Sequence, residues 1–190
     1  YTYDLDTNEI NQMTNNYVVT QYMAVSNDNH IVWVDYREHQ KPELFSYNFI
    51  NGEEQQITSL HGHYSINNAE VGIIYLTTKF PAVYDDKLVF QGKYSDDGYG
   101  YSILFCELNP ESEYYCNDEN LKQVSSHLPS ERGYPDIHEN IVVWKDERND
   151  EGDVYMCDLT AESEYECGVN ERRLTFDGKQ YFPKVYGNNI

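Results

Sequence analysis

The chemistry that this sequence could carry rests first on its four cysteines. They stand at the ends of two similar segments, CELNPESEYYC (106–116) and CDLTAESEYEC (157–167), which are identical at seven of eleven positions. Nine residues separate the two cysteines of each pair, whereas zinc sites usually draw cysteines two to four residues apart. A redox C-x-x-C motif is absent. Disulfides, free thiols and a metal site are the three interpretations to weigh.

Acidic turns are a second candidate. The segments YSDDGYG (94–100) and DERNDEGD (146–153) combine carboxylates with glycine, which suits a hard cation such as Ca²⁺. Neither segment has the spacing of an EF-hand loop. The alternative is a solvated, charged turn, because the chain has 33 acidic residues in all. The calcium hypothesis rests on Asp96, Asp97, Asp150 and Asp153.

The segment LHGHYSINNAEVGIIYLTTK (60–79) is a third candidate. His61 and His63 would point the same way on an extended strand and could share a metal, but no third ligand stands beside them. The alternatives are an added strand or a patch that packs on a partner. Exposed tyrosines are further candidates for binding, both in this segment and in the loops between the cysteines, 107–115 and 158–166: Tyr64, Tyr75, Tyr114 and Tyr165.

Sequence motifs of catalysis are missing. The chain has no G-x-S-x-G, no H-E-x-x-H, no P-loop and no dinucleotide-binding glycine pattern. Among so many acids no carboxylate pair can be singled out for glycoside chemistry. We therefore assign no catalytic residue.

Composition limits the partners. The net charge of −20 repels nucleic acid and anionic lipid, so neither is expected as a partner. No run of 18 apolar residues exists, and membrane insertion is not expected. Tyrosine contributes 19 of the 190 residues, which favours strands over helices.

The elements that must position these residues form an internal repeat. Residues 22–58, 80–125 and 134–175 each predict strand, turn, strand, turn, strand and strand, and they end on a Q/R-apolar-T/S motif. Residues 1–14 match the end of such a unit, and 181–190 match its start. Residues 60–79 are an insertion between units. Asp146 and Arg148 recur as Asp35 and Arg37, which indicates a structural ion pair or turn hydrogen bond.

One unit is four short antiparallel strands, the pattern of a β-propeller blade. A lone blade cannot cover both of its faces, so nearly continuous apolar strands need a neighbouring blade on each side. Trp33, Phe90 and Trp144 occupy equivalent positions and are expected to pack between sheets. We expect an all-β, single-domain propeller segment (1–190) with about three complete blades and two partial ones. The remaining blades of a larger propeller would come from the same parent chain or a neighbouring subunit.

The repeat also bears on the cysteines. Eight positions separate the end of the third strand from the closing motif in the units without cysteine, as from Leu5 to Met13. In the units with cysteine the distance is 16, from Leu108 to Val124, and 15, from Leu159 to Leu174. Cysteines thus occur only where this hairpin is longer, which favours local disulfides, Cys106 to Cys116 and Cys157 to Cys167. Closing such a loop is worth about 3 kcal/mol, and paired cysteines imply an oxidising compartment.

The best copy of the unit, YPDIHENIVVWKDERNDEGDVYMCDL followed by RRLT, resembles TolB-type β-propeller repeats, and the resemblance covers nearly the whole chain. Propellers of this kind serve as protein-interaction platforms, as cell-surface repeat proteins, or as companion domains of peptidases and polysaccharide-degrading enzymes. The resemblance implies a periplasmic, extracellular or cell-surface location.

Together these features favour a non-catalytic, secreted or surface-exposed propeller that serves as a structural or protein–protein interaction module. The alternatives are the propeller domain of a polysaccharide lyase or peptidase, and a lectin-like carbohydrate binder. A protein or glycan partner is expected, and calcium is the one candidate cofactor.

Overall fold

Strands in separate antiparallel sheets make up nearly all the regular structure of the chain. The computed structural model describes residues 1–14, 20–37, 42–59, 63–66, 69–73, 79–92, 100–117, 120–126, 130–149, 151–161, 167 and 170–190, and only the backbone of 63–66 and 69–73. These ranges include a 3₁₀ turn, η1 (Leu159–Ala161). No helix in the described part of the chain is long and apolar enough to cross a membrane.

Three four-stranded sheets follow one another along the chain, and within each sheet the strands lie in sequence order. The first sheet contains β3 (Gln21–Ser26), β4 (His30–Asp35), β5 (Glu43–Asn48) and β6 (Glu54–Gln56). The second contains β9 (Lys79–Tyr84), β10 (Lys87–Gly92), β11 (Ser102–Glu107) and β12 (Lys122–Gln123). The third contains β13 (Arg132–His138), β14 (Ile141–Asp146), β15 (Asp153–Asp158) and β16 (Arg172–Arg173). The predicted all-β fold of four-stranded antiparallel sheets is confirmed.

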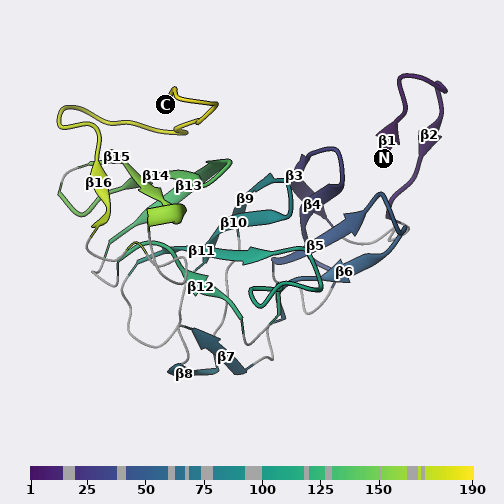
Figure 1. Cartoon of the computed structure of the whole chain (residues 1–190), viewed down its shortest axis with the longest axis horizontal. Coiled ribbons are helices and arrows are strands. Elements are labelled where there is room, and N and C mark those ends of the chain that lie inside the picture. Colours follow the sequence, from purple (N-terminus) through teal and green to yellow (C-terminus); the bar gives the residue numbers. More distant parts are fainter. Residues whose placement is uncertain are drawn as a thin grey trace.

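The sheets fan out from a row of first strands. Strand β9 contacts both β3 and β13, whereas the outer strands β6, β12 and β16 pair only within their own sheets. Figure 1 shows the three sheets succeeding one another from blue through teal to green. We call β3, β9 and β13 the inner strands, because in this arrangement they are the strands that face the axis of a propeller.

Two apolar cores fill the spaces between the sheets. The first core joins Val32 and Leu44 of the first sheet to Leu88 and Phe90 of the second. The second core joins the opposite face of the second sheet to the third sheet, where Trp144 is fully buried. The second sheet is therefore apolar on both faces, which explains its nearly continuous apolar strands. Trp33 is also buried, at 4% exposed, but it belongs to neither core between sheets; its ring stacks on Phe45 of the same sheet, with 6.1 Å between the ring centroids.

Each inner strand contains a β-bulge at the same place. The register shifts between β3 and β4, between β9 and β10, and between β13 and β14, always opposite the buried aromatic residue of the second strand. The bulged residue has a left-handed backbone, with φ of 55° at Met23, 51° at Phe80 and 54° at Tyr134. A proline follows Phe80 and Tyr134, and proline is tolerated at a bulge on an edge strand because it has no N–H to donate. At Phe80 and Tyr134 the bulge changes the direction of the aromatic side chain.

The closing T/S of each repeat has one structural role. The hydroxyl of Thr58 accepts a hydrogen bond from the backbone N–H of Leu44 at 2.9 Å. Ser125 accepts in the same way from Ile103 at 3.1 Å, and Thr175 from Val154 at 2.9 Å. The hydroxyl thus satisfies a buried backbone donor where the short fourth strand ends.

The cysteines are paired as expected from the loop lengths. Cys106 is bonded to Cys116 with 4.9 Å between their Cα atoms, and Cys157 to Cys167 with 5.9 Å. All four are at most 2% exposed and belong to the cores between sheets. The backbone N–H of Cys167 donates to Val124 of the second sheet, and Gln55 of the first sheet donates to the carbonyl of Cys116. Each disulfide therefore fastens its loop against the preceding sheet.

The remaining segments lie outside the three sheets. Strands β1 (Thr2–Tyr3) and β2 (Ile10–Asn11) form a separate two-stranded sheet, as do β7 (His63–Ile66) and β8 (Ala69–Ile73) within the insertion 60–79. Figure 1 shows the β7–β8 hairpin apart from the sheets, at the bottom of the view. Residues 181–190, expected as a first strand, form no strand; they lie along β13, with the N–H of Val185 donating to Asp136.

Removal of one disulfide tests its contribution to stability. Replacement of Cys157 and Cys167 by serine should lower the free energy of unfolding by about 3 kcal/mol, because the unfolded chain gains loop entropy. Urea unfolding of the variant and of the wild type, each with and without reductant, measures the effect. Reductant should then destabilise the wild type more than the variant. Peptide mapping without reductant that joined Cys106 to Cys157 would contradict the pairing.

Candidate functional site

A buried carboxylate with two arginines fixes the inner end of the boundary between the second and third sheets. Asp146 is 0% exposed and accepts hydrogen bonds from Arg132 Nε at 2.7 Å, Arg148 Nε at 2.9 Å and Ser130 Oγ at 2.6 Å. Arg148 also pairs with the buried carboxylate of Glu171. The network reaches the second sheet, where the N–H of Ser126 donates to Glu171.

The first sheet repeats half of this network. Asp35 accepts from Trp33 Nε1 at 3.0 Å and from Arg37 Nε at 2.8 Å, as Asp146 accepts from Trp144 and Arg148. The guanidinium of Arg37 lies 4.1 Å from the ring of Phe45, and that of Arg148 lies 4.4 Å from the ring of Tyr155. The structural ion pair predicted from the recurrence of Asp and Arg is confirmed. Only the third sheet has an arginine at the position of Arg132.

The network is absent from the described residues of the second sheet. Gly92 stands where the other two sheets have Asp35 and Asp146, and the fully buried Leu121 stands where they have Glu54 and Glu171. An apolar contact therefore replaces the ion pair at the boundary between the first and second sheets. The network is thus not a general requirement of the fold but a feature of particular boundaries.

These contacts act on the acid–base behaviour of Asp146. Burial alone would raise the pKa of this carboxyl, but hydrogen bonds from Arg148 and the charge of Arg132 prevail and lower the pKa to about 2. The pKa of Asp35 is also lowered, because hydrogen bonds from Arg37 and Trp33 outweigh burial. Both carboxylates are therefore ionised at neutral pH.

A row of aromatic rings runs across the inner strands. The rings of Phe80 and Tyr134 lie 4.3 Å apart between their centroids, and the rings of Tyr134 and Phe182 are also 4.3 Å apart. Phe80 and Tyr134 are the residues that the bulges turn toward their neighbours. The ring of Tyr134 is thus packed against an aromatic neighbour from each adjoining segment.

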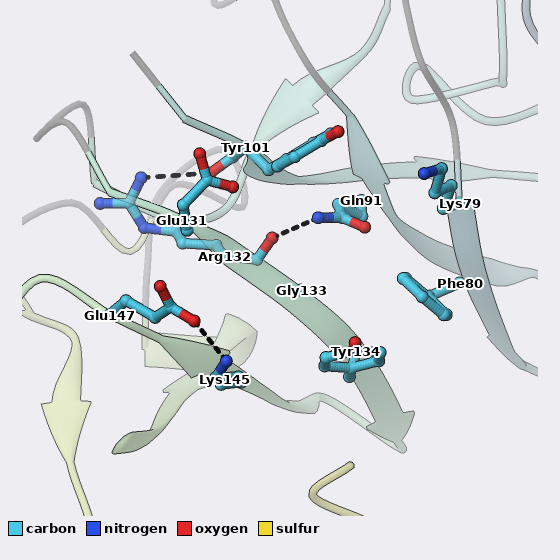
Figure 2. A pocket seen from close by; sticks show the side chains of 10 residues that line it. All are labelled: Lys79, Phe80, Gln91, Tyr101, Glu131, Arg132, Gly133, Tyr134, Lys145 and Glu147. Atoms are coloured by element: carbon cyan, nitrogen blue, oxygen red, sulfur yellow. Dashed lines mark hydrogen bonds and ion pairs between the residues drawn. The ribbon is translucent and has the colours of Figure 1, made fainter. Parts of the chain in front are cut away.

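Beside this row lies a pocket of about 270 Å³ at the inner end of the boundary between the second and third sheets. Figure 2 shows the ten residues that line it: Lys79, Phe80, Gln91, Tyr101, Glu131, Arg132, Gly133, Tyr134, Lys145 and Glu147. They come from β9, β10, β13, β14 and the segments next to them. Three of the thirteen Lys and Arg residues of this acidic chain line the pocket.

Gln91 is a buried polar side chain in the pocket. It is only 7% exposed, and its Nε2 donates to the backbone oxygen of Arg132 at 2.7 Å. Its Oε1 has no hydrogen-bond partner. Gly133 leaves room for the amide, because a Cβ at that residue would lie 3.1 Å from Nε2. An unsatisfied buried acceptor costs about 1–3 kcal/mol, so a feature that retains one is a candidate binding group.

The charges around Gln91 are unevenly paired. Lys145 pairs with Glu147, and its ammonium lies 4.1 Å from the ring of Tyr181. Lys79 faces Gln91 directly across the strands β9 and β10, and within the described ranges its ammonium has no ion pair or hydrogen bond. The pocket therefore offers one uncommitted donor next to one uncommitted acceptor.

The predicted site residues whose side chains are described, Tyr114 and Asp153, do not line this pocket. Tyr114 is half-buried against the second core, with the ammonium of Lys122 5.7 Å from its ring. Asp153 is buried and pairs with Arg173 at 2.6 Å. His63 and Tyr64 belong to β7, of which only the backbone is described. The other candidates fall outside the described residues: His61, Tyr75, Asp96, Asp97, Asp150 and Tyr165.

Metal binding therefore stays a prediction. Among the described residues no group of three or more His, Cys, Asp or Glu side chains could hold a metal ion. The described member of the calcium hypothesis, Asp153, stands at the position of Glu43 in the first sheet, and both acids contact a residue of the fourth strand. Asp153 thus has a structural partner within its own sheet.

The pocket was missed because its residues are dispersed over 69 positions of the chain, from Lys79 to Glu147. One sequence pattern did point to it. An aromatic residue precedes proline at the start of each later repeat, as in FPA, YPD and YFP. That pattern served only to align the repeats, although it marks the bulges that bring Phe80 and Tyr134 together.

Comparison with known proteins supports the fold and gives no family. No protein-family model matches the chain, and no curated protein is significantly similar in sequence. Among solved structures, a putative TolB from Agrobacterium tumefaciens superposes with a TM-score of 0.51 at 11% identity, over 80% of this chain and 47% of that one. TolB from Acinetobacter baumannii gives 0.47 at 13% identity, over 82% and 34%. A chain of a nidogen/laminin complex gives 0.44 at 13% identity, over 78% and 44%.

The first of these similarities establishes a TolB-like β-propeller fold. The chain spans about half of the first matched structure and about a third of the second. At such low identity the similarity says nothing about ligands, and function has to be argued from the pocket itself.

Titration of Asp146 gives a test of the buried network. Its pKa is lowered from 3.8 to about 2, so its stabilising contribution is complete above about pH 4 and is lost as the pH falls through 2. The contribution is about 2 kcal/mol, and the variant Asp146→Asn should lack this part of the acid dependence. The free energy of unfolding near pH 5 and near pH 2 measures it.

The control is Glu111→Gln, which removes an exposed carboxylate from the same acidic chain. It should follow the wild type at both pH values. An Asp146→Asn variant with the same acid dependence as the wild type would show that the network does not hold the carboxylate ionised.

Proposed function

We propose that this chain is a non-catalytic propeller module that binds a protein partner at the inner-strand pocket, in a secreted, cell-surface or periplasmic protein. The observation that carries the proposal is the pocket with an unsatisfied acceptor at Gln91 and an uncommitted ammonium at Lys79. The aromatic row and the buried network around Asp146 hold the walls of this pocket in place. A concave site with a few convergent polar groups is a common setting for recognition.

The compartment is supported by the cysteines. All four are placed in two disulfides, and disulfides persist in oxidising environments. The high negative charge agrees with a soluble surface that repels nucleic acid and anionic lipid. Calcium at the acidic hairpins and additional blades from the parent chain or a neighbouring subunit remain parts of the proposal.

A matched pair of charge reversals tests the interaction. Lys79 lies in the pocket, and Lys87 lies at the opposite end of the same β9–β10 hairpin. Immobilised wild-type chain and the Lys87→Glu variant should retain the same protein from the extracellular fraction of the source organism. The Lys79→Glu variant should retain at least tenfold less, measured by quantitative mass spectrometry.

Two outcomes would contradict the proposal. A set of retained proteins that does not differ between the two variants would remove the pocket from the interaction. Turnover of a peptide or polysaccharide that is lost in Lys79→Glu but not in Lys87→Glu would make the chain an enzyme domain instead.

A further inference from the structure

We propose that the pocket binds the carboxamide side chain of an asparagine or glutamine that a protein partner inserts between the second and third sheets. This inference rests on the proposed function, which names the pocket but not the chemical group that enters it.

The orientation of Gln91 determines what the ligand must supply. Because the backbone oxygen of Arg132 can only accept, the amide nitrogen of Gln91 must face it and Oε1 must face the pocket. Figure 2 shows the amide between the Arg132 backbone on one side and Lys79 and Phe80 on the other. The ligand must therefore donate a hydrogen bond to Oε1.

Lys79 adds the complementary requirement. It is the direct cross-strand partner of Gln91, so both side chains stand on the same face of the sheet. Its ammonium donates and cannot accept, and the ligand must therefore also present an acceptor. A carboxylate would satisfy Lys79 but not Gln91, and a cationic group would be repelled by Lys79. A carboxamide satisfies both with its adjacent N–H₂ and C=O groups.

Size and packing favour a single side chain. The volume of about 270 Å³ is below the range of about 300–1,000 Å³ that holds drug-sized ligands. A sugar also offers donors and acceptors, but its recognition commonly uses an open aromatic face. Here the ring of Tyr134 is packed against both Phe80 and Phe182. The neutral carboxamide also avoids the repulsion that the chain's charge of −20 imposes on an anion.

Matched amino-acid derivatives test this assignment. N-acetyl-glutamine amide and N-acetyl-methionine amide share their backbone amides and differ in the side-chain carboxamide. Added to the ¹⁵N-labelled chain, the glutamine derivative should shift the side-chain amide resonances of Gln91 and the backbone resonances of Lys79 and Gly133. The methionine and glutamate derivatives should bind at least fivefold more weakly.

Variants show whether the response depends on the side chain of Gln91 and on that of Lys79. Gln91→Met and Lys79→Met should each reduce the response to the glutamine derivative at least fivefold, whereas Lys87→Met should not. If Gln91→Met fails to fold, Lys79→Met carries the test, because Lys79 is only half-buried at the end of its strand. Folding of each variant is checked from its amide spectrum.

Three results would overturn the inference. An equal response to the methionine derivative would show that the backbone amides of the probe are bound. Shifts of the same resonances by glucose, galactose or N-acetylglucosamine, without a response to the glutamine derivative, would assign the pocket to a sugar. A coupling through a hydrogen bond between the Lys79 ammonium and the side-chain carbonyl of Gln91 in the free chain would show that Lys79 already satisfies Oε1. Any of these results overturns the inference alone. If partner binding is still lost in Lys79→Glu, the proposed function stands.

Discussion

A sheet that is apolar on both faces has to be covered on both faces, and this requirement organises the molecule. Leu88 and Phe90 of the second sheet are buried against the first, and Val89 and Phe105 are buried against the third. No α-helix in the described ranges shares the task. The sheets meet along their inner strands, because β9 contacts both β3 and β13. The pocket lies where they meet.

The boundary between the first and second sheets and the boundary between the second and third sheets are packed with different kinds of side chain. Leu121 closes the first boundary with apolar contact, whereas Asp146, Arg132 and Arg148 bring charge into the second. Removal of one partner from such a buried set costs about 3–5 kcal/mol, since a charge is then left without compensation. The polar boundary holds the pocket around Gln91, and a second pocket of about 410 Å³ lies at the apolar boundary. Its ion pairs keep Arg132 in place, and the Arg132 backbone in turn orients Gln91.

Much of this architecture could be predicted from the sequence, because it repeats. Local strand patterns gave the three sheets, loop lengths gave the cysteine pairing, and the recurrence of Asp and Arg gave the ion pair. The pocket could not be predicted in the same way. Gln91 and Gly133 have no special pattern around them, and their contact depends on a register shift in β13 that sequence periodicity does not encode. Tyr114 was expected to be an exposed binding residue, but its ring is half-buried against the second core.

The cysteine-bearing loops have a consequence for how the chain is made. Each disulfide packs against the sheet that precedes it in the sequence: the Cys106 loop against the first sheet, and the Cys157 loop against the second. Synthesis runs from the N-terminus, so the surface that receives each pair has already emerged when its cysteines appear. Neither crosslink has to wait for a later part of the chain. Each disulfide can therefore form as soon as its own sheet has been synthesised.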